Sequence, residues 1–430
     1  MLDITLIRDN PEAVKEGLTK KNADPKLVDK FLRLDEEWRS KTSALDQLKA
    51  EQNTLSKELA TNRSEDLLTR ATLLKKRVAE VSEEQDTIAV KRTEILRKMP
   101  NLPASDVRAG KDDSENQVLR TEGKIPAFSF PAKDYLAIGE ALDIIDTERA
   151  GKVSGSRFGY LKGDGALLEF ALIQYVIATL TPKGFRPVVP PVMIKPEIMA
   201  AMGYMDEHSD EIYQLKDDEL VLVGTSEQSV GSMHAEETLP AESLPLRYVA
   251  FSTCFRREAG SYGKDTRGIL RVHQFDKLEM FSFAPADASA KEHEFLLACE
   301  EELLGGLGIP YQVIDICSGD LGTPAAKKWD LEAWVPSEGK YRETHSTSNC
   351  TDFQARRLNI GWKNPETKKR EIIHTLNGTA FAIGRTIIAI LENFQNADGT
   401  VTIPEPLRPF MMGKKVLGEV PAPKSKAKKG

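Results

Sequence analysis

The sequence lacks the cysteine patterns of zinc sites and of disulfide-linked secreted domains. Its four cysteines lie far apart and none belongs to a CxxC pair, which argues against both kinds of site and fits a reducing compartment. The N-terminal MLDITLIRDNPEAV carries charges where a signal peptide needs an apolar core, and it is acidic where a transit peptide is basic. We find no run of about 18 apolar residues, so no membrane span is expected. The sequence predicts a soluble, cytoplasmic protein without zinc.

Two nucleotide-binding motifs are also missing. Neither GxxxxGK[ST] nor a strand-borne GxGxxG occurs, so a nucleotide site here would be neither a P-loop nor a Rossmann crevice. The net charge of −7 is not that of a globally basic protein, and a nucleic-acid partner would have to be met by local patches. With 430 residues, 40% of them hydrophobic, the chain can bury a sizeable core.

Heptad repeats are the main feature of the N-terminal part. A first series runs from Phe31 to Leu59 with a companion series from Leu34 to Leu55, interrupted at Lys41 and Gln52. A second repeat begins at Leu67, after the polar ATNRSED, and stops before Pro100. We predict two long helices folded back as an antiparallel coiled coil, each reaching roughly 50 Å.

The outer faces of such a helix pair must be solvated, so charges on them are expected. The pair could be a structural or dimerising coiled coil, or an arm that grips an extended partner. The compact basic cluster Lys75, Lys76 and Arg77 could meet phosphates, as could Arg97 and Lys98, although acidic residues interleave with both.

Composition divides the chain into four parts. Residues 1–100 form the helical domain, 101–131 are a linker rich in Pro, Ser, Asp and Gly, 132–418 form a second domain, and 419–430 are a basic low-complexity tail predicted to be disordered. In the second domain the candidate strands follow one another with few intervening helices. We therefore predict an α+β fold with an antiparallel sheet flanked by helices. TAFAIGRTIIAILENFQ, at 379–395, is predicted to be a long helix.

The stretch from Cys254 to Met280 carries the strongest local signal. RYVAFSTCFRRE and GILRVHQFDKLEMFSF interleave apolar and charged residues, and the segment between them is glycine-rich and polar. We predict two antiparallel strands joined by a long loop. Such a hairpin could be solvated surface, or it could hold arginines and carboxylates at fixed depth for a phosphate ester and its metal ion.

Three further segments contain polar residues in unusual settings. VGTSEQ lies at 223–228, and YRETHSTSNCTDFQARR, at 341–357, is dense in hydroxyls and could equally be a hydroxyl-rich turn. In LNGTAFAIGRT, at 376–386, Arg385 follows apolar residues and could be drawn inward toward an anion.

Read together, these segments resemble the seryl-tRNA synthetases, a class II aminoacyl-tRNA synthetase family. FRREAG with DTRGILRVHQFDKLE is similar to the second signature motif of class II enzymes, and KVSGSRFGYLKGDGALLEFAL, SNCTDFQARR, NGTAFAIGR and PEPLRPFM follow in the family's order across nearly the whole chain. The resemblance implies an aminoacyl-tRNA ligase that activates L-serine with ATP and transfers it to tRNA(Ser), with tRNA(Sec) as a further candidate. It also implies Mg²⁺, a tRNA-binding coiled-coil arm, a homodimer formed through GFRPVVPPVMI, and no membrane partner.

The same resemblance implies site residues, position by position. The catalytic ones are Arg256, Glu279 and Arg385. Serine binding falls to Thr225, Glu227, Arg256, Glu279, Asn377 and Thr379. ATP binding falls to Arg256, Arg257, Glu258, Arg271, Val272, Phe275, Glu343, Thr344, His345, Ser346 and Arg385, and Mg²⁺ binding to Glu343 and Ser346.

Some features depart from the family pattern, and other functions remain to be weighed. His345 and Thr347 stand where the family often has the smaller residues of EVSSCSN. A homologue that aminoacylates carrier proteins would resemble the second domain but lack the long arm. A binding protein without catalysis should have lost one of Arg256, Glu279, Glu343 or Arg385, and all four are present.

Overall fold

The structure, a computed structural model, describes residues 1–205, 209–259 and 267–418. It divides into two compact units, residues 1–102 and 103–430. The basic tail at 419–430 and most of the predicted loop SYGKDTRG lie outside the described residues.

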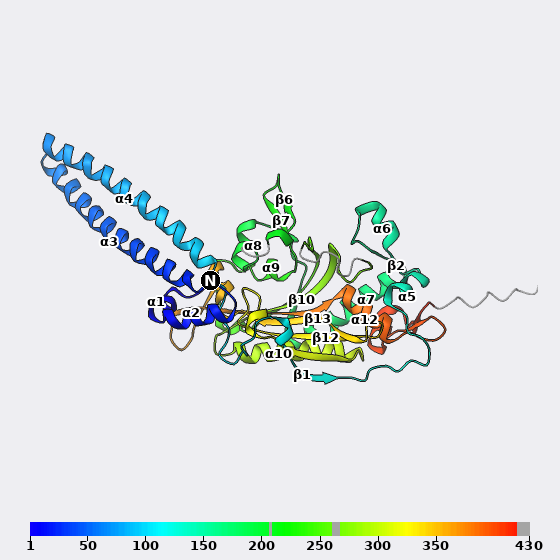
Figure 1. Ribbon diagram of the computed structural model, residues 1–430. Coiled ribbons are helices and arrows are strands. Elements are labelled where there is room, and N and C mark those ends of the chain that lie inside the picture. Colours follow the sequence, from blue (N-terminus) through cyan, green and yellow to red (C-terminus); the bar gives the residue numbers. More distant parts are fainter. Residues whose placement is uncertain (206–208, 260–266, 419–430) are drawn as a thin grey trace, which may run out of the picture. The chain divides into compact units, whose positions relative to one another are not determined.

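Unit 1 is a helix pair with a short helical lead-in. α1 (Ile4–Asp9) and α2 (Pro11–Lys20) precede the long helices α3 (Lys26–Thr61) and α4 (Glu65–Arg97), which run side by side in Figure 1. Ser64 caps α4 by accepting a hydrogen bond from the Leu67 amide at 3.3 Å. The predicted antiparallel coiled coil is confirmed.

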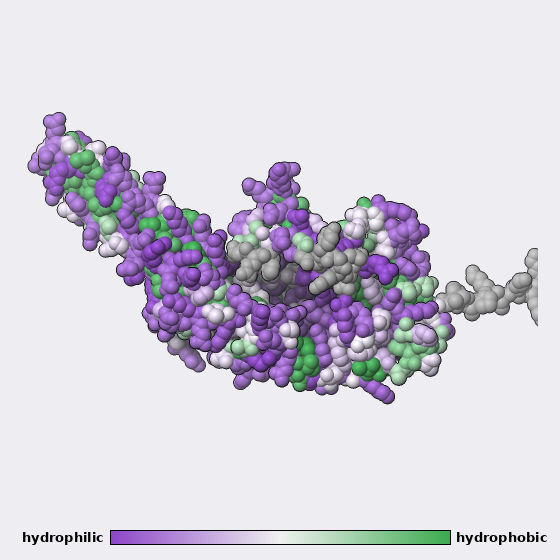
Figure 2. All heavy atoms as spheres, in the orientation of Figure 1, coloured by the Kyte–Doolittle hydropathy of each residue, from purple (hydrophilic) through white to green (hydrophobic). Residues whose placement is uncertain are grey.

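The seam between α3 and α4 explains the interruptions in the heptads. Phe31, Leu45 and Leu55 are buried on α3 and Leu74 and Val81 on α4. Polar residues pair across the seam where the apolar series breaks: the Gln85 Nε2 donates to Thr42 Oγ1 at 2.8 Å, and Lys41 forms an ion pair with Glu84. Outside the seam the surface in Figure 2 is mostly hydrophilic, with scattered exposed apolar side chains such as Leu73 and Val90.

Unit 2 is built on one large sheet with the strand order β1-β11-β12-β13-β16-β10-β9-β4. Its pairings are antiparallel except for β4 with β9, so the predicted α+β class is confirmed. The strands are β1 (Gln117–Glu122), β4 (Phe185–Val188), β9 (Leu246–Phe255), β10 (Gln274–Ala284), β11 (Tyr311–Asp315), β12 (Lys327–Val335), β13 (Lys340–Asn349) and β16 (His374–Ala382).

Helices cover both sides of this sheet. α7 (Asp164–Leu180), α10 (Ser289–Gly306) and α12 (Ile383–Asn393) pack on it and share one large apolar core. In Figure 1, α8 (Pro196–Met202), α9 (Glu227–Val230) and strands β6 and β7 lie above the sheet, and α10 lies below it. The remaining helices are α5 (Tyr135–Ala141), α6 (Thr147–Ser154) and α11 (Phe353–Leu358).

In the part of the chain that the structure describes, ten short strands form four small sheets. They are β2 (Ile145–Asp146), β3 (Tyr160–Leu161), β5 (Met193–Ile194), β6 (Gln214–Leu215), β7 (Leu220–Leu222), β8 (Thr238–Leu239), β14 (Gly361–Lys363), β15 (Arg370–Ile372), β17 (Val401–Thr402) and β18 (Val416–Leu417).

Three segments differ from the sequence-based expectation. The predicted helix at 379–395 begins only at Ile383, because residues 379–382 continue β16 and pair with β10. Residues 340–349 form the central strand β13, since β12 and β16 pair with it on either side, and this rules out the hydroxyl-rich turn that was one of two interpretations of 341–357. Residues 117–122, within the predicted linker, form the edge strand β1 against β11.

Among the described residues, one helical segment, Asp164–Lys183, is long and apolar enough to cross a membrane, with a mean hydropathy of 1.4. This differs from the prediction that the chain has no membrane span. The core helix of a soluble protein passes the same test, and Leu168, Leu172 and Val176 of this helix pack into the core of unit 2.

Candidate active site

The β9–β10 hairpin forms the floor of the candidate site. The two strands pair from Gln274 with Phe255 to Phe283 with Leu246, as the alternating pattern predicts. Because side chains of a strand alternate between faces, Lys277 and Glu279 of β10 emerge on the same side. Both are buried, so this hairpin is no solvated surface element.

A cavity of about 510 Å³ opens above this floor. It is lined by residues from segments that are far apart in the sequence, among them nine of the predicted site residues. These are Thr225, Glu227, Arg256, Glu258, Arg271, Glu279, Ser346, Asn377 and Arg385.

A β-bulge brings Glu279 and Thr379 together. Leu278 pairs with Phe381, but Glu279 pairs with Thr379, so Ala380 is an extra residue in β16. Directly opposed residues point to the same face of a sheet. The Thr379 hydroxyl accordingly donates to Glu279 Oε2 at 3.4 Å, which explains why Thr379 reaches the site without lining the cavity itself.

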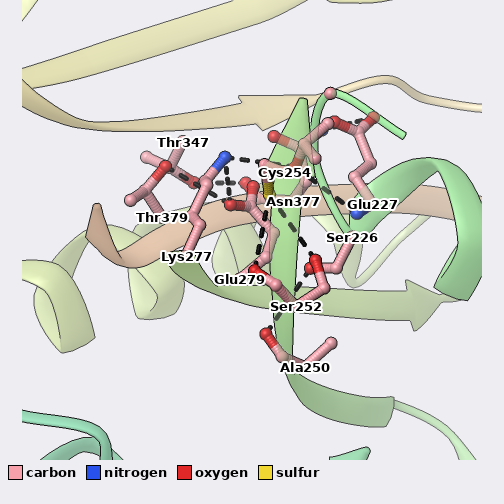
Figure 3. A network of polar contacts seen from close by, with 12 residues as sticks. Ser226, Glu227, Ala250, Ser252, Cys254, Lys277, Glu279, Thr347, Asn377 and Thr379 are labelled. Carbon is pink, nitrogen blue, oxygen red and sulfur yellow. Dashed lines mark hydrogen bonds and ion pairs between the residues drawn. The ribbon is translucent and has the colours of Figure 1, made fainter. Parts of the chain in front are cut away.

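Lys277 connects Glu279 and Thr379 to Thr225 in the VGTSEQ segment. Its ammonium forms an ion pair with Glu279 and donates to Thr225 Oγ1 at 3.2 Å. Figure 3 shows the Lys277, Glu279 and Thr379 side chains directed toward one another. Burial raises the pKa of Glu279, and the Lys277 charge opposes that rise.

Glu227 is buried among neutral donors. It accepts hydrogen bonds from Tyr204 Oη at 2.8 Å, Gln354 Nε2 at 2.9 Å and Asn377 Nδ2 at 3.2 Å. Burial raises its pKa, and the bonds from Gln354 and Tyr204 oppose the rise. Among the described residues Glu227 has no salt-bridge partner. A carboxylate held in this way is suited to a cationic ligand.

The arginines of the hairpin are held in place by neighbouring groups. Arg256 donates from Nε to the Gly224 carbonyl at 3.2 Å, and its guanidinium lies 5.2 Å from the centre of the Phe275 ring. Arg271 pairs with Glu258 at 2.8 Å. Glu258 itself adopts a left-handed backbone conformation with φ of 53°, which is unusual for a residue with a Cβ and is concentrated at functional sites.

Arg385 and Glu343 form the other end of the site. Arg385, at the start of α12, donates to the Glu343 carbonyl at 2.9 Å and lies 3.5 Å from its carboxylate. Dense packing around Glu343 disfavours its charge, but nearby cations, Arg385 first, outweigh this and lower its pKa to about 2. The carboxylate is nevertheless 48% exposed, so an ionised oxygen ligand faces solvent.

The remaining predicted residues do not line the cavity. Arg257 is exposed, and Val272 and Thr344 are buried. His345 is also buried and lies edge-on to Phe381 with ring centres 5.6 Å apart. Burial lowers the His345 pKa to about 3, so this imidazole is neutral at pH 7.

Sequence reasoning missed three residues of the site. Gln354 stands within the DFQARR motif, and Lys277 within HQFDKLE, so both were in view without a role. Tyr204 lies just after α8 and carries no local signal, because only the tertiary fold brings its hydroxyl to Glu227.

No cluster of three or more His, Cys, Asp or Glu side chains within 1–205, 209–259 and 267–418 could hold a metal ion.

Comparison with known proteins identifies the class of this site. Residues 211–394 match the model of the tRNA synthetase class II core domain (G, H, P, S and T). This match, together with the antiparallel sheet and the β9–β10 hairpin that carries FRREAG and RVHQFDKLE, identifies a class II aminoacyl-tRNA synthetase.

Matches to the N-terminal unit and to full-length relatives identify the family within this class. Residues 1–103 match the seryl-tRNA synthetase N-terminal domain. The serine–tRNA ligase of Thermobifida fusca is 46% identical over 97% of this chain and 99% of its own. The chain belongs to the seryl-tRNA synthetase family, whose members are serine–tRNA ligases.

Two solved structures support the same family. The seryl-tRNA synthetase from Pyrococcus horikoshii, complexed with ATP, superposes with a TM-score of 0.90 at 41% identity and covers 97% of this chain and 99% of its own. The cytoplasmic serine–tRNA ligase from Naegleria fowleri, in complex with AMP, superposes with a TM-score of 0.86 at 34% identity, covering 97% and 98%.

Proposed function

We propose that this chain activates L-serine with ATP and charges tRNA(Ser), with tRNA(Sec) as a second candidate acceptor. The observation that carries the proposal is the buried Glu227, which lacks a salt-bridge partner among the described residues and shares a cavity with Arg256 and Glu279. An amino acid bound there would offer its ammonium to Glu227, its carboxylate to Arg256 and its side chain to Glu279.

In the first step a serine carboxylate oxygen attacks the α-phosphorus of ATP. A P–O bond forms, the bond to pyrophosphate breaks, and seryl-adenylate remains. This step needs charge neutralisation and in-line positioning more than an acid or base. Arg256 neutralises the α-phosphate, and Arg271 stabilises the bent triphosphate.

The adenosine part of ATP lies between two flat groups. Phe275 stacks on one adenine face and Arg385 on the other, with Arg385 also close to the γ-phosphate. Glu258 accepts from the adenine amino group. Arg257, Val272, Thr344 and His345 complete the ATP-binding segments, with His345 supporting its strand from the buried side.

Serine selectivity depends on Glu279 and Thr379, which face the side-chain hydroxyl, with Thr225 and Asn377 beside them. A site built to pair with a hydroxyl rejects alanine and glycine, because its own buried polar groups would then stay unpaired. Threonine is excluded by volume.

Glu343 and Ser346 are the residues that would hold Mg²⁺ together with phosphate oxygens. The donor set fits: a half-exposed ionised carboxylate and a hydroxyl that lines the cavity are hard oxygen ligands. Bound there, Mg²⁺ would offset the negative charge of the phosphates.

In the second step a hydroxyl of the terminal ribose of tRNA attacks the seryl carbonyl, and AMP leaves. We assign residues 1–100 to tRNA binding through the α3–α4 arm and 132–418 to catalysis, in a cytoplasmic enzyme. Serine-dependent ATP–pyrophosphate exchange followed by tRNA charging tests both steps. Exchange without charging contradicts the ligase, and exchange with a different amino acid contradicts the specificity.

We also propose a homodimer formed through 184–194 and the outer face of α7. Phe170 is 63% exposed and Val189 is 81% exposed, which suits an apolar interface. Sedimentation of the wild type and of Val189→Asp tests this: the variant should shift toward monomer, and a monomeric wild type contradicts the dimer.

A further inference from the structure

Helix α10 carries a buried carboxyl group that the proposed reaction does not use. Glu300 is 0% exposed, and no donor among the described residues meets either of its carboxylate oxygens with good hydrogen-bond geometry, although the Thr379 amide lies close enough to act on the carboxyl group. Leaving such a group poorly paired lowers the stability of a fold. Groups of this kind are concentrated at functional sites.

The carboxyl group lies against the strand that carries the serine-binding residues. A Cβ built on Gly378 would be 3.0 Å from Glu300 Oε1, so the missing side chain makes room for it. Gly378 pairs with Met280 and Thr347, on the α10 side of the sheet. Its neighbours Asn377 and Thr379 point to the opposite side, where the cavity lies.

The surroundings favour the neutral acid. Burial raises the pKa of Glu300 well above its usual value, and the negative charges of Glu279 and Asp330 act in the same direction. Lys277 and the Thr379 amide oppose them. The pKa of Glu300 is therefore affected by the charges of Lys277 and Glu279, which lie beside the cavity on the other side of the sheet.

We propose that Glu300 is a positioning residue for the amino-acid substrate: its side chain supports the Gly378 backbone from behind and so sets the position of Asn377 and Thr379. The inference rests on the proposed serine activation and adds a specificity determinant outside the cavity. Glu300 does not touch ATP or serine, so its effect should fall on the amino acid alone.

Two substitutions separate the polarity of the side chain from its shape. Glu300→Gln keeps the size and neutrality of the side chain, and Glu300→Met keeps the size but removes the polar atoms. Glu294→Met is the matched control, because Glu294 is exposed on the same helix. The measurements are the KM values for serine and ATP in pyrophosphate exchange, together with the melting temperature.

We expect Glu300→Gln to stay within about twofold of the wild type in both KM values. Glu300→Met should raise the serine KM by about tenfold or more while the ATP KM stays within about twofold. The control should change neither. A serine KM in Glu300→Met equal to that of the wild type would overturn the inference, as would an equal rise in both KM values that follows a fall in melting temperature.

Failure of the proposed function is recognised separately, in the wild type. If the wild type activates another amino acid, the same comparison is made with that amino acid. If it activates none, calorimetric binding of a seryl-sulfamoyl adenosine analogue and of ATP replaces the kinetics. Weaker analogue binding by Glu300→Met, with ATP binding unchanged, then supports the inference, and equal analogue binding overturns it.

Discussion

The two units of this protein place their charges differently. Every residue of unit 1 is described, and its only buried polar side chains are Asp35 and Asn101. In unit 2, by contrast, Glu227, Lys277, Glu279 and Glu300 are buried around one part of the sheet. The helix pair leaves its charges in solvent, whereas the sheet of unit 2 keeps a cluster of charges buried beside the cavity.

Asp35, the exception in the arm, shows what a purely structural buried carboxylate looks like. It accepts from Arg8 and Arg92 at 2.8 Å and from Arg39 at 3.2 Å. Arg92 also lies over the rings of Phe31 and Trp38. Where a buried charge is fully paired within the protein it holds the fold, and where the described residues supply no cationic partner, as at Glu227, it is suited to binding a ligand.

The largest effect is expected inside the sheet. Glu279→Gln should lower serine-dependent pyrophosphate exchange by about 10²–10³-fold, because an amide cannot accept both from Lys277 and from the substrate hydroxyl with equal strength. Melting temperature should change far less. Ser282→Ala, on the same strand, controls for general damage to β10. A parallel loss of folding would show that Glu279 is structural, as Asp35 is.

The strongest test of the arm is Asp35→Ala. It leaves Arg92, which is only 14% exposed, without its partner, and should destabilise unit 1 by about 3–5 kcal/mol. Calorimetry of the full chain should show an earlier transition, and tRNA charging should fall with it, while pyrophosphate exchange persists. The exposed Asp46→Ala on α3 is the control. Loss of exchange as well would contradict the separation of the two units' roles.

A pH test applies to unit 2. Burial and the neighbouring Asp276 raise the pKa of Glu169, on α7, to about 8. The folded state thus holds a proton that the unfolded chain releases near pH 4.5, so this contribution is complete at low pH and is lost as the pH rises toward 8. Glu169→Gln should remove about 2 kcal/mol of that pH dependence. Urea unfolding at pH 5.5 and 8.5 measures it, with the exposed Glu140→Gln expected to behave as the wild type.

The smallest effect is expected on the arm surface. Lys75→Ala with Lys76→Ala should raise the KM for tRNA several-fold and reduce its salt dependence by a log–log slope of about 1.5, because each phosphate contact contributes just under one unit. Pyrophosphate exchange should not change. Lys291→Ala, exposed on α10, is the control, and an unchanged salt slope in the double variant would place the tRNA contacts elsewhere.

Local patterns predicted those parts of the molecule whose signal lies within one element. The heptads defined α3 and α4, and the alternation in RYVAFSTCFRRE and RVHQFDKLEMFSF predicted β9 and β10. The position-by-position resemblance to the family predicted nine of the residues that line the cavity. In these cases the residues that form the sequence pattern are the same residues that form the predicted helix, strand or cavity wall.

The rest depended on partners distant in the sequence. KYRETHSTSN has few apolar residues, yet β13 is largely buried because strands lie on both sides and α10 lies behind it. The roles of Tyr204 and Glu300 depend on their neighbours in space, Glu227 for Tyr204 and Gly378 for Glu300. No local sequence pattern connects the members of either pair. The late start of α12 has the same cause, since TAFA is helix-compatible by itself and is held as strand by β10.

The bulge at Ala380 also sets the phase of the helix that follows. Only Ile383 and Gly384 separate the end of β16 from Arg385. Removing one residue from the strand would turn every later α12 side chain by about 100° around the helix axis. Arg385 would then leave Glu343, even though the deleted residue lies beside Glu279 and Thr379 at another part of the cavity. One irregular backbone position thus keeps two parts of the cavity in register.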